Sequence, residues 1–296
     1  MTSDKQAKIA SWVSIAANIF LTIVKVGVGL WAGSKALFAD GIHSAIDILA
    51  SIAALSAVTI AYRPADDSHP YGHGKAEDLA ASLVSLVLFM AGGYIVYSST
   101  QGLFLPPHGL GQTALYIGII SLVIKEALYR YTKRLADSLN SPALMALAQD
   151  HRSDIWGSWA AVFGVGGSLL GRVTHVPLLT YADPIAGFCV GLLILCTSYT
   201  MGSSAIDALM ERNVDPELLS SYIELAKSVS GIERVDRLRA RKLGHYILVD
   251  VRASVQGEKS IQEGHDIIRE VKFTIMNAHP DVKEVLVHLN PFYGEQ

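Results

Sequence analysis

The stretch ALFADGIHSAIDILASIAALSAVTIAY, residues 36–62, decides the architecture, because it is long and apolar yet carries two metal-binding side chains. About 20 mainly apolar residues are enough to cross a bilayer as an α-helix. His43 and Asp47 are four residues apart, so on a helix they lie one turn apart on the same face. Ionisable side chains at membrane depth are costly and usually mark a functional site. The stretch therefore predicts a spanning helix with a functional polar pair.

A second stretch repeats this pattern, because Asp150 and Asp154 are again four residues apart in the apolar segment 143–171. If the two helices face each other, the two pairs supply four ligands, which suits a divalent cation. One His with three Asp is a harder ligand set than a His-rich zinc site, so Mn(II), Fe(II) and Zn(II) all fit. The neighbouring His151 points about 100° away on a helix, so we place it at a helix interface or behind the ligands.

The composition is that of a membrane protein. The 296 residues are 51% hydrophobic and 17% charged, whereas a soluble protein carries about 25% charged residues. Hydropathy is expected to be weakest in the two segments with the polar pairs. The segments long enough to cross a bilayer are 9–32, 36–62, 77–103, 112–132, 143–171 and 181–209.

The distribution of Lys and Arg predicts the orientation. These residues gather at the N-terminus and after the second, fourth and sixth segments, whereas the other side has few, and its turn at 106–111 is uncharged. Positively charged loops remain in the cytoplasm. We therefore expect both termini in the cytoplasm, with the chain in a bacterial-type inner membrane.

The tail, 212–296, reads as a separate domain after the membrane domain, 1–211. Its polar and alternating patterns predict helices at 216–228 and 260–278 and strands at 235–242, 245–255 and 282–289. Pro291 is expected to end the last strand. The order αββαβ predicts a small α+β, ferredoxin-like domain with both helices on one face of the sheet.

Two further polar groups are candidate metal sites. In the loop DDSHPYGHGK, residues 66–75, Pro and Gly allow tight turns that could bring Asp66, His69 and His73 together. A solvated turn is the alternative. In the tail the candidates are Asp236, Asp250, His265 and His288, and a solvated sheet surface is the alternative there.

Three motifs together resemble the cation diffusion facilitator family: LFADGIHSAID at 37–47, HPYGHGKAE at 69–77 and DHRSD at 150–154. The resemblance covers nearly the whole chain. It implies a homodimeric secondary transporter, not an enzyme, that exports divalent metal in exchange for protons and has no resident cofactor.

The resemblance also implies roles for particular residues. It places the transport site at His43, Asp47, Asp150 and Asp154, and a loop metal site at Asp66, His69 and His73. It further implies a charge contact near the dimer interface between Lys75 and either Glu211 or Asp207, and a C-terminal domain that dimerises and often binds metal. Zinc members usually have His at the position of Asp150, so this site is harder.

Proton coupling follows from the ligand chemistry. Metal binds neutral imidazole and ionised carboxylates, so binding releases protons. Imidazole side chains titrate at about pH 6.5, which is within physiological reach. His43 is therefore the candidate proton-coupling residue in an alternating-access cycle, with an Asp as a second carrier.

Two other functions remain open. The chain could be a membrane-anchored metal sensor, although an anchor needs no ligands in its spans, or a passive channel, although channels keep binding weak. Intramembrane proteolysis, ATP-driven pumping, acyl hydrolysis and nucleic-acid binding find no support. The sequence has no His-Glu-x-x-His helix, phosphate-binding loop or G-x-S-x-G elbow, and no basic run with interleaved aromatics.

Overall fold

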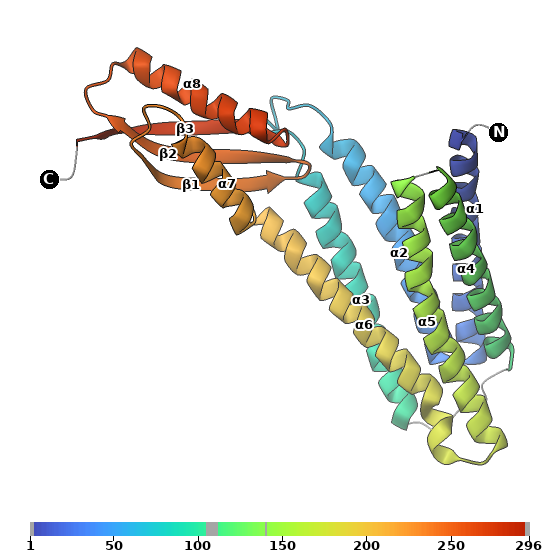
Figure 1. Cartoon of the computed structure of the whole chain (residues 1–296). Helices are drawn as coiled ribbons and strands as arrows, with labels where there is room; N and C mark the ends of the chain where they lie inside the picture. The colour runs from blue at the N-terminus through green and yellow to red at the C-terminus, as the bar shows by residue number, and fades with distance from the viewer. Residues whose placement is uncertain (1–2, 105–111, 140, 294–296) are drawn as a thin grey trace. The chain divides into compact units, whose positions relative to one another are not determined.

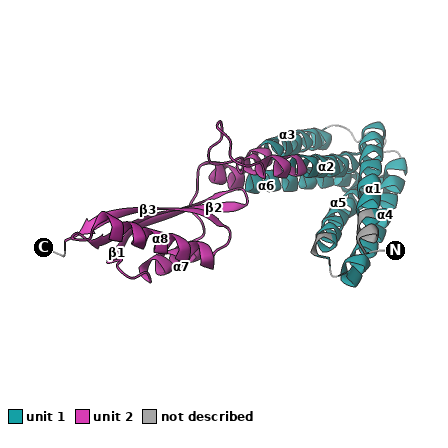
Figure 2. Cartoon of the chain, turned by 90° about the horizontal axis from the view of Figure 1, so that it is seen from above, with its two compact units in different colours: residues 1–53, 83–201 teal, residues 54–82, 202–296 magenta. Residues whose placement is uncertain are grey.

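Figure 1 shows the computed structural model of the chain, which describes residues 3–104, 112–139 and 141–293. The turn expected at 106–111 lies outside these residues. The chain divides into two compact units that do not follow chain order (Figure 2). The first comprises residues 1–53 and 83–201, and the second comprises residues 54–82 and 202–296.

Six long helices occupy the positions of the six predicted spans. They are α1 (Ser3–Ala32), α2 (Lys35–Ala61), α3 (Ala76–Phe104), α4 (Gln112–Leu139), α5 (Pro142–Val173) and α6 (Ala182–Leu209), with a short 3₁₀ helix, η1 (Pro177–Tyr181), before α6. In the described chain, five of them are long and apolar enough to cross a membrane, α2 included, so its expected weakness was wrong. Helix α5 has the length but carries Asp150, Arg152 and Asp154 close together.

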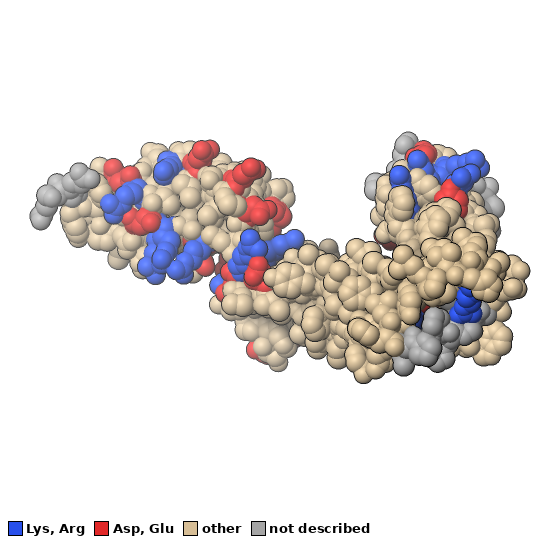
Figure 3. All heavy atoms as spheres, turned by 90° about the horizontal axis from the view of Figure 1, so that it is seen from below, with Lys and Arg blue, Asp and Glu red and all other residues tan. Residues whose placement is uncertain are grey.

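The first unit packs through an apolar cluster and through buried small and polar side chains. Helices α1, α4 and α5 lie against one another, and α2, α3 and α6 share a cluster that includes Ile46, Leu88 and Ile194. Large apolar side chains such as Trp12 and Phe89 are exposed. Lipid tails solvate such side chains, so membrane helices rely on close packing and polar contacts instead. Figure 3 shows a broad surface of the helical unit with few charged side chains.

The C-terminal part is an α+β domain, as predicted. It contains α7 (Pro216–Lys227), β1 (Arg234–Leu243), β2 (Tyr246–Gln256), α8 (Ile261–Ala278) and β3 (Val282–Phe292). The sheet order is β1-β2-β3, with β1 antiparallel and β3 parallel to β2. One sheet face buries Val249 and Val251 against Tyr222 of α7 and Val271 of α8. Polar side chains therefore project from the opposite face, because successive residues of a strand alternate.

Strand β3 does not end at Pro291, contrary to expectation. It runs to Phe292, and Pro291 lies opposite Val255 of β2. Proline cannot donate to a ladder, but an edge strand tolerates it, because one side of the strand needs no partner. Helix α8 begins close to the expected boundary, and a capping box between Ser260 and Glu263 closes its N-terminus.

Candidate metal centres

Helix α2, which carries His43 and Asp47, is fixed at its N-terminus by a buried carboxylate. Asp183 of α6 accepts hydrogen bonds from Ser34 Oγ at 2.6 Å and from the backbone N–H of Lys35 at 2.7 Å. A negative charge at this end of a helix also suits its dipole. At Gly41 a Cβ would lie 2.8 Å from the Val26 nitrogen, so glycine lets α1 and α2 approach closely.

Three of the four predicted transport-site residues lie together. His43 and Asp47 of α2 and Asp154 of α5 each offer a ligand atom, and these atoms lie within 4.8 Å of one another. His43 Nε2 is 3.9 Å from Asp47 Oδ2. Asp150 is exposed and stands outside this group. The arrangement offers one imidazole and two carboxylates, a set that suits divalent transition metals.

A buried lysine contacts the same group. Lys125 of α4 donates to Asp154 Oδ2 and to Asn18 Oδ1, the latter at 2.7 Å, and its side chain is 1% exposed. Sequence reasoning missed this residue. Its signal was a lysine inside a predicted span, which is costly without a partner. A cation bound to this group would therefore share the Asp154 carboxylate with the Lys125 ammonium.

A second buried ion pair joins α1 and α2 and reaches Ser158 of α5, which lies one turn after Asp154. Lys25 Nζ is 2.7 Å from Asp40 Oδ2 and donates to Ser158 Oγ at 3.1 Å. Ser158 in turn donates to Asp40. This triad joins α1, α2 and α5. His151 is fully buried and its Nε2 is 3.0 Å from Ser14 Oγ of α1, which is the interfacial position that the sequence suggested.

The predicted loop residues also converge. Asp66, His69 and His73 offer ligand atoms within 4.8 Å of one another. His69 Nδ1 is 3.3 Å from Asp66 Oδ1, and His73 Nε2 is 3.5 Å from Asp66 Oδ2. The backbone N–H of His69 donates to Asp66 at 2.7 Å and, with that of Ser68, lowers the pKa of this carboxyl group. Asp66 therefore stays ionised and able to bind a cation.

The loop is docked on the β1–β2 hairpin. A Cβ at Gly74 would lie 2.5 Å from the Leu243 carbonyl oxygen, so only glycine fits there. The Tyr246 hydroxyl donates to the Tyr71 carbonyl. The rings of Tyr62 and His245 stack with centroids 4.0 Å apart. The turn chemistry was predictable from Pro and Gly, whereas this docking was not.

Lys75 pairs with Glu211, one of its two candidate partners, within the chain. The Nζ–Oε1 distance is 3.1 Å, and Glu211 also binds Arg241 at 2.9 Å. The Lys75 hydrogen bond, with help from Arg241, lowers the pKa of Glu211. Asp207 pairs instead with Arg212 at 2.7 Å.

The four C-terminal candidates do not form one group in the described chain. Asp236 accepts from Ser254 Oγ at 2.7 Å, from Asn290 Nδ2 at 3.0 Å and from Arg234 Nε at 2.7 Å, and these bonds lower its pKa. Asp250 and His288 project from the open sheet face. His265 belongs to α8, which covers the opposite face.

The helical unit and the α+β domain define a polytopic membrane protein with a group of side chains among its helices that could hold a cation. The chain belongs to the cation diffusion facilitator family of cation efflux transporters. Residues 11–210 match the family model described as the cation efflux transmembrane domain, and residues 214–292 match that of the cation efflux protein cytoplasmic domain.

Similar proteins extend along the whole chain. The manganese efflux system protein MneP of Bacillus subtilis is 40% identical over 100% of both chains. MneS of the same organism is 32% identical over 97% of this chain and 96% of its own. Metal tolerance protein 2 of Oryza sativa is 34% identical over 94% of this chain and 76% of its own.

Proposed function

We propose that the chain exports divalent transition metal in exchange for protons, as a homodimer that works by alternating access. The observation that carries this proposal is the convergence of His43, Asp47 and Asp154 between two helices of a cation efflux domain. Asp150, one turn before Asp154, is the proposed fourth ligand. It joins the group when the helices rearrange during the cycle.

Mn²⁺ is the first candidate cargo, with Fe²⁺ and Zn²⁺ as the others. Oxygen ligands dominate the site, and carboxylates favour harder ions than imidazole or thiolate does. Two of the relatives reported above are named as manganese efflux proteins. Affinity alone is a poor guide to the cargo, because Zn²⁺ binds more tightly than Mn²⁺ at most such sites.

Proton exchange follows from the ligands and their neighbour. Metal requires His43 neutral and the aspartates ionised, so protons that arrive at these ligands promote release. When metal is absent, the ammonium group of Lys125 remains beside the Asp154 carboxylate and neutralises its charge. The site thus alternates between a metal-bound form and a form neutralised by lysine and protons.

The proposed setting is a bacterial-type inner membrane with both termini in the cytoplasm, because Lys and Arg concentrate on that side. Residues 1–211 form the transport domain and residues 212–296 the dimerisation and metal-regulatory domain. The group Asp66–His69–His73 then faces the cytoplasm, where it binds or delivers metal. The Lys75–Glu211 pair is the proposed charge contact near the dimer interface.

Uptake by inside-out proteoliposomes with an imposed pH gradient tests this function. Mn²⁺, Fe²⁺, Zn²⁺ and Cd²⁺ would be compared, with Asp47→Ala as the inactive variant and Asp215→Ala, outside every metal group, as the matched control. We expect uptake that requires the gradient and disappears only in Asp47→Ala. Flux that ignores the gradient would indicate a channel, and no flux from well-folded protein would indicate a sensor.

A further inference from the structure

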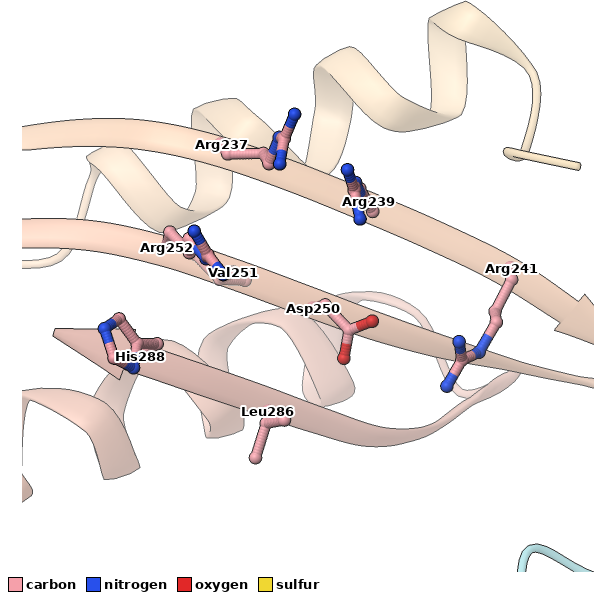
Figure 4. A pocket seen from close by; sticks show the side chains of 8 residues that line it. All are labelled: Arg237, Arg239, Arg241, Asp250, Val251, Arg252, Leu286 and His288. Atoms are coloured by element: carbon pink, nitrogen blue, oxygen red, sulfur yellow. The ribbon is translucent and has the colours of Figure 1, made fainter. Parts of the chain in front are cut away.

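The open face of the C-terminal sheet carries a row of basic side chains. Arg237 of β1 lies directly opposite Arg252 of β2, and Arg252 lies directly opposite His288 of β3. Arg239 lies one position further along the same face, opposite Asp250. Figure 4 shows these side chains, which come from all three strands and surround one hollow.

The row is not neutralised by the protein itself. Like charges directly opposite each other destabilise a strand pair. Within the described residues, no carboxylate lies within ion-pairing distance of Arg237, Arg239 or Arg252. Asp250 is the one acidic side chain among the residues that line the hollow, and Arg241 is already paired with Glu211. Three unpaired arginines against one aspartate leave the face positive.

The face is hollowed as well as charged. A cavity of about 380 Å³ lies over the strands and is lined by the row together with Arg239, Asp250 and Leu286. Its floor is firm, because Val249 and Val251 of the same strand are packed into the core beneath. A ligand in this hollow would therefore meet several positioned guanidinium groups at once.

The chemistry of the lining favours an anion over a metal ion. Arginine is always charged and has no acceptor atom, so it repels cations and cannot ligate them. Its fork matches phosphate oxygens in a bidentate way. Adjacent strands are about 4.8 Å apart, so the row across three strands spans about 10 Å. One phosphate group is too short to contact the whole row, whereas linked phosphates are not.

We propose that this face binds a phosphate-bearing anion with at least two phosphate groups or comparable charge. The proposal does not rest on the transport function, because none of the residues that line the hollow belongs to the group of His43, Asp47 and Asp154 or to the group of Asp66, His69 and His73. Asp250 and His288, which were candidate metal ligands in the tail, are assigned here to the anion site instead. The source of the phosphate is either a soluble polyphosphate compound or the headgroup of an anionic phospholipid, which share this chemistry.

The test uses the full chain in neutral detergent, freed of metal, and titrates inorganic triphosphate in a calorimeter. Arg237→Gln and Arg252→Gln remove one charge each from the row. Arg269→Gln is the matched control, because it removes the same charge from α8 on the other side of the domain. We expect salt-dependent binding that is at least about tenfold weaker in each row variant, since charge-assisted bidentate contacts are strong, and unchanged in the control.

The same protein titrated with a short-chain cardiolipin, whose headgroup carries two linked phosphate groups, separates the two sources. Tighter binding of triphosphate indicates a soluble anion, and tighter binding of the lipid indicates a headgroup. Either result supports the site if Arg237→Gln and Arg252→Gln weaken the binding of that probe. The proposal is overturned if neither probe binds. It is also overturned if Arg269→Gln weakens binding as much as the two row variants do.

Discussion

Replacing Lys125 by Gln should tighten metal binding at the transport site. Lys125 contacts Asp154, and the two side chains are 1% and 15% exposed. An incoming metal ion must either displace the ammonium or tolerate a positive charge beside it. Glutamine removes the charge and keeps a hydrogen-bond donor for Asp154 and Asn18.

The structure sets the size of the effect. Two unit charges 4 Å apart interact with about 4 kcal/mol at an effective dielectric constant of about 20. Mn²⁺ carries two charges, which doubles this energy to about 8 kcal/mol. Because about 1.4 kcal/mol corresponds to a tenfold change in affinity, the upper limit is on the order of 10⁵- to 10⁶-fold. Solvent around the half-buried ligands reduces this value, so we expect the Kd for Mn²⁺ to fall by about ten- to a hundredfold.

Free Mn²⁺ can be counted by its electron paramagnetic resonance signal during titration of detergent-solubilised protein. His69 and His73 are replaced by Ala in every sample to silence the loop group. Lys25→Gln is the matched control, because Lys25 is equally buried but pairs with Asp40. An unchanged or weaker affinity in Lys125→Gln, or equal tightening in Lys25→Gln, would refute the competition between lysine and metal.

Three other predictions concern selectivity, stability and the loop. Asp150→His should move the Mn/Zn transport ratio toward zinc, because imidazole suits zinc better; an unchanged ratio in vesicles would count against Asp150 as a ligand. Glu211→Gln should lower the melting temperature at pH 7 by removing the Lys75 pair, worth at most about 1 kcal/mol. Because the pKa of Glu211 is lowered in the fold, its contribution is present above the unfolded pKa and is lost as pH falls through the folded value, so the difference in melting temperature should shrink as the solution is acidified. Gly74→Ala should weaken metal binding by the loop in calorimetry, since its Cβ would meet a backbone oxygen at 2.5 Å, whereas Gly93→Ala, with open space around it, should not.

Local patterns predicted most of the fold. The six helical segments and the αββαβ order follow from apolar length and periodicity, which act within short windows. The end of β3 was missed because Pro291 breaks central strands but not an edge strand, and edge position is a tertiary property. Family motifs and helical spacing likewise predicted that His43, Asp47 and Asp154 lie together.

Contacts between distant segments could not be predicted. The partner of Lys125 lies 29 residues away, and the Lys25–Ser158 bond joins residues 133 apart. The basic row on the sheet depends on strand register, which sets Arg237 opposite Arg252 and is decided by the whole domain. Asp150 illustrates the opposite case, because helical spacing placed it beside Asp154 but did not bring it into the cluster.

The central claim is that His43 ligates the transported metal, and pulsed electron paramagnetic resonance of bound Mn²⁺ tests it most directly. The sample is the full chain with His69 and His73 replaced by Ala. We predict a coupling from an imidazole nitrogen that disappears in His43→Gln and persists in His151→Gln, because His151 is bonded to Ser14 instead. A coupling that survives His43→Gln, or no nitrogen coupling with Mn²⁺ bound, would contradict the account.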